Sequence, residues 1–250
     1  MRFASSLVIV VSLLLPVYSQ TAAQNQGKDI LQHSFAAMGC GNLGTETPIS
    51  VTGNLNLSDG AAIPLTIASQ GDDRLRSELD TPKGHKTTVI NAGRGEIRHS
   101  SGKVQKLAGH NTSHQHPMHI PCLVVLGHPS GRLEATFLRS DAGAGDVADV
   151  VEILPAHHTD HKGLIAQMKE TLWISRENGY VTKLQYKNMA EQDPNETYTV
   201  TIEYSDYRLI DGVAVPFQQV TRSGDVAFTL RLTSVRINAP AANFTLEVGQ

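Results

Sequence analysis

Hydrophobic and polar residues alternate with a period of two over much of the chain. From residue 49 to residue 57, Ile, Val, Gly, Leu and Leu occupy the odd positions, and Ser, Thr and Asn occupy the even ones. Successive side chains of a β-strand point to opposite faces, so this pattern predicts a strand with one buried and one hydrated face. Shorter segments of the same kind predict further strands at residues 74–80, 86–91, 95–99 and 103–107.

The C-terminal half repeats the pattern at intervals of roughly ten residues. Turn sequences such as Asn178-Gly179 and Asp211-Gly212 separate the segments, and Asn-Gly is a strong signal for a two-residue hairpin. Connections this short cannot hold the crossover helices of a parallel sheet. We therefore expect a mainly β (α+β) fold with antiparallel strands. The strands expected in this half are 148–154, 169–176, 180–187, 197–207, 213–222, 226–233 and 235–237.

Two segments show a helical pattern instead. Leu31, Phe35 and Met38 recur at spacings of four and three residues, which places them on one helical face, and Gly39 ends that segment. Residues 121–127 form a short apolar stretch that begins with proline, a residue favoured in the first turn of a helix. We expect one helix within residues 27–38 and a second, short one within 121–127.

The N-terminus has the order of a secretory signal. Arg2 is followed by the apolar run from Leu7 to Leu15 and then by Pro16. A membrane-spanning helix needs about 20 apolar residues, so this run is too short for a permanent anchor. We expect residues 1–23 to be a cleaved signal peptide, with cleavage after Ser19 or Ala23. Residues 24–250 would then be a single domain, exported and soluble, with no transmembrane segment.

Charge and cysteine content narrow the class of protein further. The net charge is −3 at pH 7, and loss of Arg2 with the signal peptide would make it more negative, so nucleic acid is excluded as a partner. Cys40 and Cys122 would meet oxidising conditions after export. Two interpretations remain open for them: a disulfide, or two separate buried thiols that pack as small hydrophobic residues.

Histidines raise the alternative of a metal-binding or metal-dependent protein. One group lies in a polar, turn-rich segment and another follows an apolar strand, and the candidate ligands in them are His114, His116, His119, His158, Asp160 and His161. The second group approaches the H-x-H-x-D-H motif of metallo-β-lactamase-like hydrolases, but Ala156 occupies its first position. The chain also lacks a G-x-S-x-G elbow, a Walker loop and an H-E-x-x-H motif. We therefore expect no enzyme activity and no cofactor.

The C-terminal half resembles a known family. It contains Tyr204, Asp206, Tyr207 and Arg208, followed by Asp211-Gly212-Val213 and Pro216. This order is similar to the Y-x-D-Y-R … D-G-V-x-x-P pattern of the periplasmic lipoprotein-carrier (LolA/LolB-like) superfamily. The likeness covers residues 170–246 well and residues 28–110 more loosely. It implies a strongly curved, unclosed antiparallel β-barrel, with short helices as a lid over its concave face. The lid elements would be Asp29–Met38 and Cys122–Gly127.

The resemblance also implies a function. It suggests a periplasmic binding or carrier protein that sequesters a lipid or acyl-chain ligand in the concave face, and whose partners include a membrane-associated protein. The alternatives are the metal-binding protein described above and a periplasmic protein-interaction or sensory module. Eight apolar side chains are the candidate lining of the cavity: Leu75, Leu79, Leu123, Leu126, Leu184, Tyr186, Val200 and Ile202.

Overall fold

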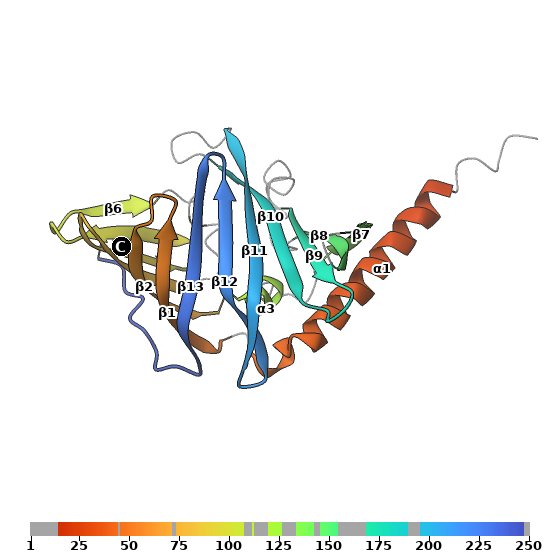
Figure 1. Ribbon diagram of the computed structural model, residues 1–250, viewed down its shortest axis with the longest axis horizontal. Helices are drawn as coiled ribbons and strands as arrows, with labels where there is room; N and C mark the ends of the chain where they lie inside the picture. The colour runs from red at the N-terminus through yellow and green to blue at the C-terminus, as the bar shows by residue number, and fades with distance from the viewer. Residues whose placement is uncertain are drawn as a thin grey trace, which may run out of the picture.

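In the computed structural model, the described part of the chain folds into one antiparallel sheet of 13 strands with a long N-terminal helix packed on it (Figure 1). The structure describes residues 15–44, 46–71, 74–107, 112, 120–126, 134–142, 146–154, 169–189 and 196–247, with the backbone alone described for residues 15–20, 125, 126 and 189. The mainly β, antiparallel fold class predicted from the sequence is confirmed.

The sheet is assembled from two meanders. The first contains β1 (Pro48–Leu57), β2 (Ala62–Gln70), β3 (Arg74–Thr81), β4 (Gly84–Asn91), β5 (Arg94–His99) and β6 (Val104–Leu107). The second contains β7 (Glu134–Ala142), β8 (Val147–Leu154), β9 (Glu170–Ser175), β10 (Val181–Met189), β11 (Thr197–Ile210), β12 (Val213–Ser223) and β13 (Val226–Ile237). The first and last strands, β1 and β13, pair along their whole length and join the two meanders. β6 and β7 are left at the two edges, so the sheet is unclosed.

One face of this sheet carries the main apolar cluster, and we call it the inner face. The strand registers place Val51 beside Ile67 and Val235, and place Leu184 beside Ile202 and Leu172. These side chains belong to one apolar cluster that also includes residues of the helical segments. The sheet is twisted and curved, and the short helix α3 (Pro121–Leu126) lies behind the central strands in Figure 1.

The N-terminal helix α1 spans Leu15–Ala37 and is longer than predicted. The expected start near Gly27 is wrong, and both proposed cleavage positions, Ser19 and Ala23, fall within the helix. Residues 21–26 are mostly exposed, so they carry no apolar periodicity that would reveal a helix. Gly27 is buried against β7, where the Cβ atom of any larger residue would lie 2.7 Å from the backbone nitrogen of Phe137. The missing side chain therefore lets α1 approach the sheet backbone.

Adding a methyl group at Gly27 is expected to destabilise the protein. Gly27→Ala gains up to about 1 kcal/mol of helix propensity, but its Cβ would overlap the backbone of β7, which cannot move like a flexible side chain. We expect a net loss of about 1–3 kcal/mol in the free energy of unfolding, measured by urea denaturation. Gly41→Ala is the control, because its Cβ would meet only Phe35 at 3.8 Å. Equal stability of the two variants would contradict this packing.

A disulfide joins Cys40 and Cys122, which settles the alternative left open by the sequence. Cys40 begins the short 3-10 helix η1 (Cys40–Asn42), directly after α1, and Cys122 lies in α3. Their Cα atoms are 5.3 Å apart and both residues are fully buried. The cross-link therefore fixes α3 to the end of the N-terminal helical segment. The short helix predicted over residues 121–127 is confirmed, with Pro121 as its first residue.

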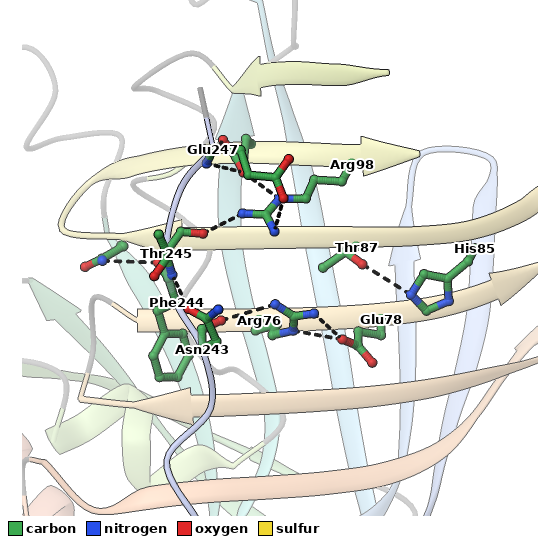
Figure 2. A network of polar contacts seen from close by, with 11 residues as sticks. Arg76, Glu78, His85, Thr87, Arg98, Asn243, Phe244, Thr245 and Glu247 are labelled. Carbon is green, nitrogen blue, oxygen red and sulfur yellow. Dashed lines mark hydrogen bonds and ion pairs between the residues drawn. The ribbon is translucent and has the colours of Figure 1, made fainter. Parts of the chain in front are cut away.

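The outer face of β3, β4 and β5 is covered by the C-terminal segment, residues 239–247, which we call the strap (Figure 2). Arg76 donates a hydrogen bond to the carbonyl of Asn243, and Asn91 donates one to the carbonyl of Phe244. The backbone N–H of Glu247 donates to both carboxylate oxygens of Glu96, at 2.9 and 3.0 Å. Glu96 is only 1% exposed beneath the strap. The strap therefore closes this part of the outer face.

Some elements differ from the sequence prediction. Two strands of the structure, β2 and β7, were not predicted from the sequence. β2 contains Pro64, which offers no N–H to a ladder, and β7 has a register shift between Phe137 and Arg139 that breaks its alternation. The segments expected at 226–233 and 235–237 form one continuous strand, β13. The turn at Asn178-Gly179 is a hairpin as predicted, but five residues separate Ser175 from Val181.

Within the described residues, no helix combines the length and the apolar character that a membrane crossing requires.

Candidate ligand-binding face

The apolar inner face is built from residues of alternating position on nearly every strand. Across β8 to β11, one cross-strand row consists of Val151, Leu172, Leu184 and Ile202, all of which are buried. A neighbouring row contains Ile153, Tyr186 and Val200. Directly opposed apolar side chains stabilise a sheet by packing across the strands. The two rows form an apolar wall across four of the 13 strands, β8 to β11.

The structure places most of the predicted lining residues in the main apolar cluster or against it. Leu123, Leu184, Val200 and Ile202 are members of the main apolar cluster, and Leu79 and Tyr186 pack against it. Leu75 is buried on the same face of β3 as Leu79 but lies outside that cluster. Leu126 lies in α3, and its side chain is outside the described residues.

Part of the inner face is apolar but only partly buried. Leu55, Ile67, Leu79 and Tyr186 contact the main cluster and yet keep some exposure to solvent. Leu55 pairs with Ile63 and Leu230, both buried, so it lies in the centre of the sheet and not at an edge. Apolar side chains that line a sheet face without complete cover are typical of binding surfaces.

A carboxyl group on the inner face was not predicted. Glu170 begins β9 and has the same strand parity as Leu172 and Ile174, which are buried in the main cluster. It pairs with Ile153 of β8 on one side and with Tyr186 of β10 on the other. Its exposed fraction is 2%. Burial away from water disfavours the charged form and raises the pKa of Glu170 to about 8.

Two tyrosines lie near this carboxyl group. The pKa of Tyr186 is raised by its burial and then by the negative charge of Glu170. The pKa of Tyr204 is raised as well, with burial as the larger cause, followed by Tyr207 and Glu170. Further along the same rows, Asn188 donates a hydrogen bond to the hydroxyl of Tyr198 at 3.0 Å. The inner face is therefore apolar in its centre and polar near the start of β9.

Strand parity is the signal in the sequence that could have located Glu170. The order Glu170-x-Leu172-x-Ile174 puts the glutamate on the face of two apolar residues, whereas Thr171 and Trp173 belong to the other face. A charged residue at the end of a strand usually lies in solvent, so the pattern alone favours exposure. The structure buries the residue because its neighbours on both sides, Ile153 and Tyr186, lie on the inner face.

The motif residues that carry the family resemblance have structural roles in β11 and β12. Tyr204 and Tyr207 both pack against the main cluster although they are three residues apart, because Asp206 between them has a φ of 52° that interrupts the regular strand. Arg208 pairs with Asp206 at 2.7 Å and lies 4.1 Å from the ring centre of Phe217. The hydrogen-bonded guanidinium lowers the pKa of Asp206. These residues shape the strand and carry no chemical group into a reactive cluster.

The metal candidates fall outside the part of the chain that the structure describes. They are His114, His116, His119, His158, Asp160 and His161. In the described ranges, no group of three or more His, Cys, Asp or Glu side chains is arranged to hold a metal ion.

Solved structures with the same fold support the resemblance seen in the sequence. A domain from Vibrio parahaemolyticus described as an outer membrane lipoprotein-sorting protein domain is 12% identical, with a TM-score of 0.57 over 88% of this chain and 95% of that one. A LolA superfamily protein from Nitrosomonas europaea is 12% identical, with a TM-score of 0.52 over 84% and 92%. A DUF1329 family protein from Desulfovibrio piger is 10% identical, with a TM-score of 0.55 over 88% and 95%.

No family model matches the sequence, and no curated protein does either. The structural matches place the chain in the fold class of the LolA superfamily, as the Y-x-D-Y-R pattern predicted. At 10–12% identity they show the fold alone.

Proposed function

We propose that this chain is an exported binding or carrier protein that sequesters an apolar ligand, a lipid or an acyl chain, on its inner face. The observation that carries the proposal is that four apolar side chains of the inner face, Leu55, Ile67, Leu79 and Tyr186, are only partly covered. The strap supports it from the other side, because it covers the outer face of β3 to β5 and leaves the inner face as the apolar surface for a ligand.

The binding energy would come from removing the ligand from water. Each methylene group transferred into an apolar site contributes about 0.8 kcal/mol. An acyl chain that is mostly buried on the inner face would bind tightly with few directed polar contacts. Leu75, Leu79, Leu123, Leu126, Leu184, Tyr186, Val200 and Ile202 remain the proposed lining.

Helical segments would cover the bound ligand. Leu123 of α3, Leu31 of α1 and Met38, the residue after α1, belong to the same apolar cluster as the sheet residues. The disulfide keeps α3 attached to the segment that follows α1. In this proposal the sheet is the concave part of a half-barrel and the helical segments are its lid.

Export is part of the proposal. A disulfide is typical of proteins that mature in an oxidising compartment. The expected signal sequence at residues 1–23 agrees with this compartment. A lipid or acylated ligand would then be met in the periplasm, together with the membrane-associated partner from which it is taken or to which it is delivered.

Placing a charge on the inner face is expected to weaken ligand binding. Leu55→Glu puts a carboxylate where an apolar ligand would lie, and we expect the affinity for N-phenyl-1-naphthylamine, a neutral fluorescent apolar probe, to fall at least about tenfold, equivalent to about 1.4 kcal/mol. Asn54→Glu is the matched control, because the neighbouring residue points to the outer face and adds the same charge. Probe titration by fluorescence measures both variants.

Equal losses of probe affinity in the two variants would contradict the proposal, because the effect would then come from charge and not from the inner face. Circular dichroism of both variants confirms that they remain folded. Failure of the wild-type protein to bind the probe at all would contradict the carrier function itself.

A further inference from the structure

Glu170 has an unfilled hydrogen-bonding requirement. Its Oε2 atom is buried and has no hydrogen-bond partner among the described residues. Buried polar atoms in folded proteins are nearly always paired, and leaving one unpaired costs about 1–3 kcal/mol. A leucine at this position would avoid that cost. Glu170 therefore needs a hydrogen-bond partner that the described residues do not supply.

The described groups that face Glu170 carry no charge at physiological pH. Tyr186 is directly opposite on β10, Ile153 is opposite on β8, and Tyr204 lies close enough on β11 for its ionisation to be affected. Burial holds the pKa values of both tyrosines above their usual range. Lys169 and Glu152, the adjacent charges, form a partly exposed ion pair with each other at 2.7 Å.

Within the residues that the structure describes, no cation compensates a negative charge on Glu170. The shift in its pKa comes from burial alone, with no contribution from a lysine, arginine or histidine of the described chain. With a pKa of about 8 the group is mostly protonated at pH 7. A protonated carboxyl group has one O–H donor, and this donor needs an acceptor.

We propose that Glu170 is the polar anchor of the ligand site, where its neutral carboxyl group donates a hydrogen bond to an uncharged acceptor, an ester or amide carbonyl, on an otherwise apolar ligand. The inference rests on the proposed function, because the acceptor must reach the inner face. It narrows the ligand from any apolar molecule to acyl esters and amides. A hydrocarbon would leave the donor unpaired, and a free fatty acid would bring an ionised carboxylate into an apolar site where no described cation compensates it.

The experiment compares ligands that differ only at the polar group. Methyl dodecanoate, tridecane and dodecylamine compete with N-phenyl-1-naphthylamine at pH 6.5 for the wild type, for Glu170→Leu and for Glu170→Gln. One neutral hydrogen bond corresponds to a factor of roughly 2–12 in affinity. We expect the wild type to bind the ester about fivefold more tightly than the alkane and Glu170→Leu to lose this preference. Glu170→Gln, whose amide can still donate, should retain part of it.

Each outcome separates this inference from the proposed function. All three proteins could bind the probe, and Glu170→Leu could prefer the ester as strongly as the wild type does. That result would overturn the role of Glu170 and leave the carrier function intact. Dodecylamine could instead be the tightest ligand, with an affinity that rises from pH 6.5 to pH 8.5 in the wild type only. That result would overturn the neutral hydrogen bond, because it would show that Glu170 is an ionised carboxylate that holds a cation. Absence of probe binding in every protein would overturn both proposals.

Discussion

Loss of the Cys40–Cys122 disulfide is expected to lower the free energy of unfolding by roughly 3–5 kcal/mol. The bond joins residues that are 82 positions apart. Cross-linking a loop of this length restricts the unfolded chain, and the entropy of closure grows with loop length. The stabilisation is a large fraction of the roughly 5–15 kcal/mol that is typical of a folded domain. Urea denaturation of the Cys40→Ala, Cys122→Ala double variant measures the loss.

Reduction of the wild-type protein is the matched control for that variant. Both cysteines are fully buried, so the double alanine variant also removes two packed sulfur atoms. Wild-type protein that is reduced while unfolded and then refolded keeps both sulfur atoms and loses only the bond. We expect both forms to unfold at lower urea than the oxidised protein, with the reduced wild type between the other two. Identical midpoints for the oxidised and reduced proteins would contradict a stabilising cross-link.

The unloaded protein is expected to lose roughly 3–4 kcal/mol of stability between pH 5 and pH 8 because of Glu170 alone. Its pKa is about 8 in the folded protein and near the ordinary value of 4.5 in the unfolded chain. The folded state therefore holds a proton that the unfolded state has released between these two values. The contribution of this group to stability is complete below pH 4.5, falls as the pH rises toward 8 and changes no further above that.

Glu170→Gln isolates this contribution from the histidines and other groups that titrate in the same range. Glutamine has nearly the same shape and cannot ionise. We expect the difference in unfolding free energy between variant and wild type to grow from pH 5 to pH 8, with the variant more stable at pH 8. Parallel stability curves for the two proteins across this range would show that Glu170 is ionised in the folded state at pH 5 and would contradict its burial as a neutral acid.

The strand pattern of the sequence was enough to predict the fold class, because period-two alternation and short turns are local properties. Ile49 to Leu57 and the strands after residue 169 are found where the alternation placed them, with small differences at their ends. α1 is longer than predicted, because residues 21–26 contact little of the core. β7 was missed because the irregular register at Phe137 and Arg139 breaks its alternation.

The candidate site was less accessible to sequence reasoning. The inner-face position of Leu184, Val200 and Ile202 was predictable because apolar residues of one strand parity share a buried face, and their role in lining a ligand site stays a prediction. Glu170 was missed because its burial depends on Ile153 and Tyr186, which reach it only through the pairing of β8, β9 and β10. The disulfide could not be decided from sequence either, since the distance between Cys40 and Cys122 depends on where α3 packs.

Native mass spectrometry of the protein purified from the periplasm, without added ligand, tests the central claim most directly. If the inner face sequesters an apolar ligand, the spectrum should contain a species heavier than the bare chain, and solvent extraction should release a molecule with an acyl chain. A single species at the mass of the unliganded chain, in protein that also fails to take up an added acyl ester, would contradict the account.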